Sequence, residues 1–283
     1  MSIMIGTDPE VFVIGGNKKV IPCVGLIPGT KEEPHPIAGH RHGLKIQEDG
    51  VTLEFNINAY NTVQTFASAV RQSVTDLKKI VRDYIPNANL HISPSHKFSE
   101  EDLRSEQAMT FGCDPDFNAW ERGNMRRPPS VKEVGLNRFA GGHIHFGYDV
   151  KNAGIPPWAL IQFIEVMGYG GYVLANGFDK QGERRKFYGL AGLYRVKDYG
   201  IEYRTPSNYW LADPVHMGVD TMYRALDLVL TRPEKARVLF KSIEAHSAAI
   251  QEAVSREVWP SELSKLYNKL WNDFEAVPAE REV

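Results

Sequence analysis

Cysteine is scarce in this sequence, with Cys23 and Cys113 the only two among 283 residues. They lie far apart and in no metal-binding spacing, which favours a reducing compartment such as the cytosol. The first residues, Met1–Ile5, lack the basic start and the apolar core of a signal peptide. No apolar run approaches the roughly 20 residues that a membrane helix needs. We therefore expect a cytoplasmic protein without a membrane partner.

An excess of charge of one sign is also lacking. The formal net charge is −2, from 33 Lys and Arg against 35 Asp and Glu, so nothing favours a nucleic-acid or anionic-membrane surface. The hydrophobic share of 42 % and the charged share of 24 % are ordinary for a globular protein. A chain of 283 residues can bury a large core. It contains neither a P-loop nor a glycine-rich dinucleotide fingerprint.

What the sequence does contain is a glycine-rich His-x-His motif, Gly141-Gly142-His143-Ile144-His145. In an extended segment, His143 and His145 leave the same face of a sheet, and Ile144 points into the opposite layer. Glycines in a strand mark a bulge or the close approach of a ligand or backbone. The motif predicts a metal or phosphate site. Taken alone, it is equally compatible with two hydrogen-bonded histidines on a half-exposed strand.

Three other predicted strands carry charged side chains on one face and apolar ones behind them. Carboxylates that converge without a cation repel one another and shift their pKa values, and a hard divalent ion relieves that repulsion. Arginines bind phosphate oxygens through both arms of the guanidinium group. These features together predict a nucleotide-triphosphate site that holds ATP and Mg²⁺ or Mn²⁺. The acids are Asp8, Glu10, Glu54 and Glu202, and the arginines are Arg184, Arg185, Arg195 and Arg204.

The rest of the pattern predicts an α+β fold, in which a curved, largely antiparallel sheet has helices on its convex side and the site on its concave face. Apolar residues at three- and four-residue intervals predict a helix over 63–84. Asp49-Gly50 predicts a hairpin turn, and 20–26 is expected to be a strand. A helix is expected from Trp158 to about Ala175, weakened by its glycines. We expect a sheet domain over 1–210 and a helical region over 211–283.

These motifs, in this order over residues 6–208, resemble the carboxylate–amine ligases of the glutamine synthetase and glutamate–cysteine ligase superfamily. More narrowly, the chain resembles the compact ligases of tailed bacteriophages, which would place it in the host cytoplasm. The resemblance implies a fold of the glutamine synthetase catalytic type. It also implies roles for the site residues. Asp8, Glu10, Glu54, His143 and Glu202 would bind metal, with Asp49 a weaker candidate, and His145 and Arg204 would contact ATP phosphate.

The activity that the resemblance implies is ATP-dependent amide formation through an acyl phosphate. One metal and Arg204 would orient the γ-phosphoryl group, with Arg195 beside them. Asp114 and Asp116 are candidates for binding the ammonium group or accepting its proton, although an Asp-Pro turn explains them equally well. The partners would be a small carboxylate and an amine, possibly with a second copy of the chain. Asp8 stands where a glutamate is more usual, and the residues that select glutamate have no counterpart.

Three other interpretations compete with a ligase. A metal-dependent hydrolase also uses His-x-His with carboxylates, but it favours histidine-rich zinc sites without phosphate-type arginines. A catalytically silent member of the same fold would bind nucleotide without turning it over. In the third interpretation, the charged residues are scattered over ordinary surface strands and form no site. That would require four motifs to occur in the right order by coincidence.

Overall fold

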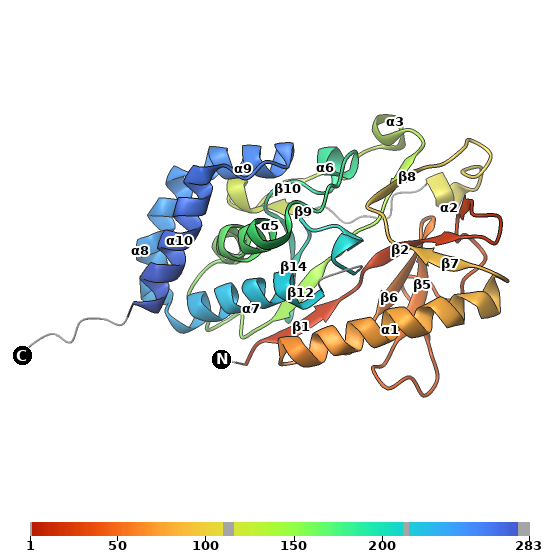
Figure 1. Cartoon of the computed structure of the whole chain (residues 1–283), viewed down its shortest axis with the longest axis horizontal. Helices are drawn as coiled ribbons and strands as arrows, with labels where there is room; N and C mark the ends of the chain where they lie inside the picture. The colour runs from red at the N-terminus through yellow and green to blue at the C-terminus, as the bar shows by residue number, and fades with distance from the viewer. Residues whose placement is uncertain (1, 110–115, 212–214, 277–283) are drawn as a thin grey trace, which may run out of the picture.

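Two antiparallel sheets form the centre of the molecule (Figure 1). The computed structural model describes residues 2–109, 116–211 and 215–276. Within them the first sheet has six strands, in the order β1-β12-β14-β13-β9-β10. Its strands are β1 (Met4–Thr7), β12 (Ile144–Gly147), β14 (Gly200–Tyr203), β13 (Leu193–Lys197), β9 (Asp116–Asn118) and β10 (Asn124–Arg126).

The second sheet is built from the N-terminal hairpins. Its order is β3-β2-β6-β5-β4, and β7 pairs with β2 in addition. The hairpin expected at Asp49-Gly50 is confirmed, because β5 pairs with β6. A second hairpin joins β2 to β3. A small separate sheet joins β8 (Ser95–Lys97) to β11 (Asn137–Phe139). The strands of the second sheet are β2 (Glu10–Ile14), β3 (Val20–Ile21), β4 (His35–Pro36), β5 (Lys45–Asp49), β6 (Thr52–Asn56) and β7 (Asn89–His91).

The two sheets meet where the chain passes from β1 to β2 through Asp8 and Pro9. Pro9 has no N–H to donate, so a regular ladder stops there. On one side of this junction, Ile5 exchanges two backbone hydrogen bonds with Tyr60, of 2.6 and 2.8 Å. On the other, the Glu10 N–H donates to the Gly141 carbonyl at 3.0 Å. The expected antiparallel sheet is therefore present as two sheets that share one seam.

Side chains alternate across the seam in the way that the period of a strand requires. Ile5, Ile144 and Phe146 are almost fully buried in the apolar core. Gly6 and His145, their neighbours in sequence, lie on the opposite face. The helix α1 (Val63–Tyr84) lies along the side of the sheets that carries the core, next to α7 (Val215–Thr231) (Figure 1). The bounds expected for α1 are confirmed.

A long apolar helix lies in the middle of the core. It comprises α4 (Pro157–Phe163), a π-helical segment η2 (Ile164–Tyr169) and α5 (Gly170–Asn176). By length and composition alone it could cross a membrane, so the expectation that no apolar run has this length was wrong. However, 83 % of its apolar window is buried in the protein, as in a core helix. Gly168 allows close packing, since a Cβ there would lie 2.7 Å from the Cα of Met222 on α7.

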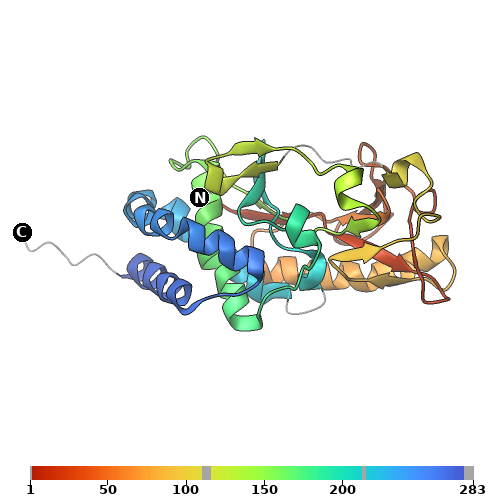
Figure 2. The same cartoon turned by 90° about the horizontal axis from the view of Figure 1, so that it is seen from above.

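The C-terminal helices are gathered at one end of the molecule (Figures 1 and 2). Their buried apolar residues, from Ala236 to Phe274, belong to the same core cluster as Ile5 and Phe146. The proposed division at residue 210 stays a prediction. The helices are α8 (Pro233–Ala245), α9 (Ser247–Arg256) and α10 (Ser261–Glu275). The short helices are α2 (Glu106–Met109), α3 (Val131–Val134), α6 (Arg184–Phe187), η1 (Ala119–Glu121) and η3 (Asn208–Leu211).

One expected strand is much shorter in the structure. The segment 20–26 forms a ladder only over Val20–Ile21. Pro22 follows at once and cannot donate to a ladder, and the chain then turns, with the Leu26 N–H donating to the Cys23 carbonyl at 2.9 Å.

Candidate active site

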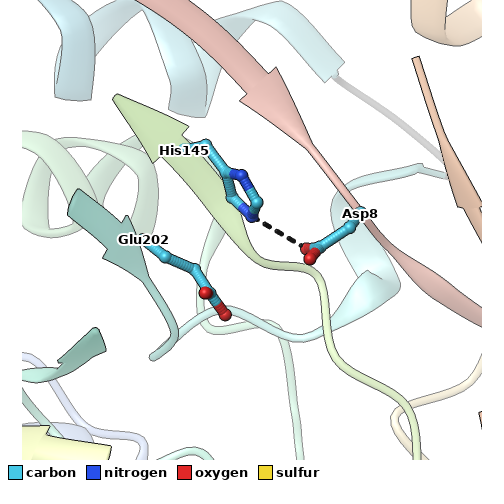
Figure 3. Close-up of side chains that lie close together, drawn as sticks. All are labelled: Asp8, His145 and Glu202. Carbon is cyan, nitrogen blue, oxygen red and sulfur yellow. Dashed lines mark ion pairs between the residues drawn. The ribbon is translucent and has the colours of Figure 1, made fainter. Parts of the chain in front are cut away.

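One row of residues crosses the first sheet next to the seam. Strand pairing places Gly6 opposite His145, and His145 opposite Glu202. Arg195 on β13 is the next residue in the row. Gly6 leaves space at the β1 end, and Asp8, two residues further on, reaches the row from there. Its Oδ1 lies 3.0 Å from Nε2 of His145 (Figure 3).

Asp8, His145 and Glu202 form the first cluster, in which one potential ligand atom of each lies within 4.8 Å of the others. Asp8 Oδ1 and His145 Nε2 are buried, yet neither has a hydrogen-bond partner of acceptable geometry among the described residues. The two atoms form an ion pair when the His145 ring is protonated, and a metal ion can take the place of that proton. Two carboxylates and one imidazole fit Mg²⁺ or Mn²⁺.

His143 occupies a different environment from His145. Its Nδ1 lies 3.1 Å from Arg204 Nη1 and 3.4 Å from Asp8 Oδ1. Its ring packs so closely on Gly141 that a side chain there would overlap it. Burial and then the charge of Arg204 lower the pKa of His143 to about 4. His143 Nδ1 also lies 3.5 Å from Glu202 Oε1. The grouping within 4.8 Å contains His145, and His143 lies directly beside it, so the metal and phosphate roles that the resemblance implies for the two histidines stay predictions.

A second cluster lies across the seam on the second sheet. Glu10 and Glu54 are directly opposite each other on β2 and β6. Asp49, at the end of β5, completes a set whose potential ligand atoms lie within 4.8 Å of one another. The Gly141 N–H donates to Glu10 Oε2 at 2.9 Å, and the Gln47 side-chain amide donates to Glu54 Oε1 at 2.9 Å. The acids expected to converge on one site thus divide between two clusters, and Asp49 belongs to the second.

Electrostatics indicate that the second cluster needs a cation. Burial, followed by the charge of Asp49, raises the pKa of Glu10 to about 8. Burial and the neighbouring charges of Asp8 and Asp49 raise the pKa of Glu54 well above its ordinary value. Burial also raises the pKa of Asp49. All three shifts favour the protonated acids, and a bound cation would favour the ionised ones instead.

The charges of the first cluster are balanced within the protein. Burial opposes ionisation of Asp8, but the charge of His145 and contacts with both histidines hold its pKa well below the ordinary value. Burial would lower the pKa of His145, but the charge of Asp8 outweighs it and the pKa is raised. Burial of Glu202 is likewise outweighed by the charge of Arg204, which lowers the pKa of that acid.

A buried network of ion pairs borders the first cluster. Asp116 Oδ1 lies 3.1 Å from Arg195 Nε and 3.0 Å from Arg204 Nε. Arg204 also contacts Glu202 directly, and Lys197 Nζ lies 2.9 Å from Glu202 Oε2. Two arginines are thus held side by side next to the first cluster, an arrangement that suits the oxygens of a phosphoryl group.

Comparison with protein families identifies this combination. Residues 134–281, more than half of the chain, match the family described as phage phiEco32-like COOH.NH2 ligase, type 2. The chain belongs to this family of carboxylate–amine ligases. It is therefore an ATP-dependent enzyme that forms carbon–nitrogen bonds, and the resemblance seen in the sequence is confirmed.

Other comparisons add little to the family assignment. A solved structure described as a GmaS/ADP complex in conformation 1 is similar at 11 % identity and a TM-score of 0.36. The similarity covers 99 % of this chain and 71 % of that chain. At this TM-score it supports no structural conclusion. The comparison with curated proteins gives no match.

The family match divides the site of this ligase. The histidines, Glu202 and all four arginines lie inside the matched residues. The acids of the N-terminal hairpins, Asp8, Glu10, Asp49 and Glu54, lie outside them. The two groups meet at the seam between the sheets, where Asp8 contacts His145 and Glu10 accepts from the Gly141 N–H.

Two of the expected phosphate ligands are enclosed by protein groups. Arg185 contacts Asp179 at 2.9 Å and the Tyr169 hydroxyl at 3.0 Å, and its side chain is only 3 % exposed. Arg185 is not among the residues that line the small cavity beside Glu10. Arg184 does line that cavity, and its Nε is buried without a hydrogen-bond partner among the described residues.

Asp114, a candidate for binding the ammonium group, lies outside the described residues.

Two hollows reach the clusters from different sides. A cavity of about 60 Å³ lies beside the second cluster and holds no more than a small group. A wider groove of about 510 Å³ runs past the first cluster. The cavity is lined by Glu10, Asp49, Thr52, Arg138, Arg184 and Arg204, among others. The groove is lined by Thr7, Asn56, His145, Tyr148 and Tyr199, among others.

Sequence analysis missed several residues around these hollows. Lys197 and Tyr199 flank the turn between β13 and β14 and reach Glu202 and His145. Both precede Ile201-Glu202-Tyr203-Arg204, an Ile-Glu-x-Arg motif that carries two of the predicted site residues, and this position in the hairpin was an available signal. Arg138 lines the cavity and donates to the carbonyl of Ala108 at 3.0 Å. Because that contact spans 30 residues, no local pattern indicated it.

Proposed function

We propose that this ligase joins a small carboxylate to an amine through an acyl phosphate, with ATP as the phosphoryl donor and a divalent metal at each acidic cluster. The proposal includes a fold of the glutamine synthetase catalytic type. The observation that carries it is the pair of separate carboxylate clusters beside two arginines held by Asp116. A hydrolase has no need of such an arginine pair.

The metals would be held by the chain's own acids. Asp8, His145 and Glu202 offer one set of ligands, and Glu10, Asp49 and Glu54 offer the other. Bound there, Mg²⁺ or Mn²⁺ supplies positive charge against the phosphate oxygens. The raised pKa values of the second set fit this role, because a cation takes the place of the protons that the acids otherwise keep.

The arginines would act on the transferred phosphoryl group. Asp116 and Glu202 hold Arg195 and Arg204 in fixed positions before a substrate arrives. Donors that are already oriented stabilise developing charge without the cost of reorganisation. Since phosphoryl transfer asks for little covalent chemistry from the protein, positioning and charge neutralisation carry most of the barrier reduction. In this proposal Asp116 holds the two arginines in place, and its role in binding the ammonium group stays a prediction.

The sizes of the two hollows suggest where the substrates lie. A nucleotide is far larger than the 60 Å³ cavity, but the groove of about 510 Å³ is within the range of ligand sites. We place ATP in the groove, with its phosphates toward His145. The reacting carboxylate then occupies the cavity beside Glu10, where Arg184 Nε is a donor without a partner among the described residues. The acyl phosphate forms at the seam between them.

A hydroxylamine trap tests the mechanism without knowledge of the amine. The full chain is incubated with ATP, Mg²⁺ and hydroxylamine and screened against amino acids and other small carboxylates. Attack of a carboxylate on the γ-phosphorus releases ADP. Hydroxylamine then displaces phosphate from the acyl carbon to give a hydroxamate. We expect hydroxamate, ADP and phosphate in equal amounts, and only when metal and the correct acid are present.

Two other results would count against this mechanism. Release of AMP and pyrophosphate would indicate an acyl adenylate instead. Metal-dependent hydrolysis of esters or amides without ATP would support the hydrolase.

A further inference from the structure

Tyr199 covers the histidine of the first cluster from the solvent side. Its hydroxyl lies 2.7 Å from Nδ1 of His145, and the two rings are nearly parallel, 5.9 Å apart with an interplanar angle of 19°. The tyrosine is nevertheless 46 % exposed, so burial of its ring does not explain why it lies against His145.

The backbone fixes Tyr199 to the strand that carries His145. The Tyr148 N–H, just after β12, donates to the Tyr199 carbonyl at 2.9 Å. Gly200 follows with a φ of +151°, and a side chain there would overlap the Phe146 carbonyl. The hairpin between β13 and β14 thus lies tightly against β12. His145 and Tyr199 keep a constant separation because both are anchored on the same strand.

The two ring nitrogens of His145 face different partners. Nε2 points at Asp8 Oδ1, 3.0 Å away, in the first cluster. A nitrogen can ligate a metal only through its lone pair, so the proton of the neutral ring must then be on the other nitrogen. That nitrogen, Nδ1, needs an acceptor, and the Tyr199 oxygen lies at the right distance. In metal sites such partners fix the tautomer and the orientation of the ring.

We propose that Tyr199 is a positioning residue, which accepts a hydrogen bond from Nδ1 of His145 and so keeps the Nε2 lone pair directed at the metal of the first cluster. This inference rests on the proposed function, because it assigns a divalent ion to that cluster. A hydroxyl both donates and accepts, so the same contact orients the ring when Nδ1 carries no proton. A carboxylate or carbonyl partner could only accept.

The contact can be removed without removing the ring. Phenylalanine would keep the ring contact and lose only the hydroxyl. Tyr209 offers a matched control, because it is 47 % exposed and contacts no histidine in the described part of the chain.

Manganese binding measures the effect directly. Mn²⁺ is titrated into the full chain carrying Glu54→Gln, which weakens the second cluster, and free Mn²⁺ is followed by electron paramagnetic resonance. Adding Tyr199→Phe should raise the Kd of the remaining site about 10- to 100-fold, as for other partners of metal-bound histidine. Adding Tyr209→Phe should leave it unchanged. Circular dichroism and the melting temperature confirm that each variant is folded.

A second measurement reports on the tautomer itself. Nitrogen-15 spectra of the histidines, assigned with a His145→Gln variant, are recorded at pH 9 with and without Mg²⁺. With Mg²⁺, His145 should carry its proton on Nδ1, and Tyr199→Phe should reduce the share of this form. An Mn²⁺ Kd within twofold of the parent, together with an unchanged tautomer, would overturn the role of Tyr199. Absence of Mn²⁺ binding in the wild-type chain would instead overturn the metal assignment, and the metal-free spectra would still test the contact.

Discussion

At the scale of single residues, the site depends on buried charged side chains that have few alternative partners. Arg204 is only 5 % exposed and lies between Asp116, Glu202 and His143. A buried cation held by two acids is costly to leave unpaired, so the geometry is strongly fixed. The shape of the guanidinium group matters as much as its charge, because it contacts several partners at once.

Arg204→Lys tests that shape. Lysine keeps the charge but loses the planar fork, so ATP turnover should fall by about 100-fold or more, as when an oriented donor is lost. The Kd for ATP should change much less, because the charge remains. Turnover and nucleotide binding are measured separately, with the exposed Arg224→Lys as the control. Turnover within a few-fold of wild type would mean that Arg204 only pairs with Asp116 and Glu202.

At the scale of elements, the entry to β12 determines where both histidines lie. Gly142 passes so close to the next segment that a Cβ would overlap the Ser207 carbonyl and lie 2.5 Å from Trp210 Nε1. Its neighbour on the seam, Gly6, is less restricted, since a Cβ there would lie 3.7 Å from His145 Cβ. Close packing against backbone therefore requires a glycine at position 142, whereas a methyl group fits at position 6.

This difference predicts opposite outcomes for two alanine substitutions. Gly142→Ala should lower the free energy of unfolding by about 1–3 kcal/mol, because backbone must move to accommodate the methyl group. Gly6→Ala should change it by less than about 1 kcal/mol. Urea unfolding followed by circular dichroism measures both. Equal effects would show that the close contact at Gly142 relaxes at little cost.

At the scale of the whole molecule, the second cluster links stability to pH. An acid whose pKa is higher in the folded protein keeps its proton there, while the unfolded chain has lost it. Unfolding then releases protons, so rising pH favours unfolding between the two pKa values. For Glu10 this window runs from 4.5 to about 8. Glu54 and Asp49 shift in the same direction.

The melting temperature in EDTA should therefore fall as pH rises through this window, by on the order of 5 °C. Saturating Mg²⁺ should remove most of the fall, because the metal binds the ionised acids and stabilises the fold by mass action. Glu10→Gln should make the curve in EDTA shallower and reduce the response to Mg²⁺, because it removes one of the shifted acids and leaves the first cluster intact. The exposed Glu101→Gln serves as the control. A curve in EDTA that is flat for the wild-type chain would show that the acids are not coupled as described.

Several features followed from the sequence because they depend on local spacing. The helix over 63–84 has an apolar face set by its own period, and Thr62 caps it with a side-chain contact to the Thr65 N–H at 3.3 Å. The His-x-His and Ile-Glu-x-Arg strands place His145 and Glu202 on one face because strand alternation requires it. The family assignment followed from the same motifs.

Only the tertiary structure decided how these motifs combine. Whether Asp8 joins His145 or Glu10 depends on the seam, where Pro9 interrupts one ladder and Gly141 accepts the next hydrogen bond. Asp49 enters a metal-type cluster because β5 and β2 both pair with β6. Arg185 is drawn into a buried pair with Asp179, although its neighbour Arg184 lines the cavity. Such contacts join residues far apart in sequence, and no local period encodes the distance between them.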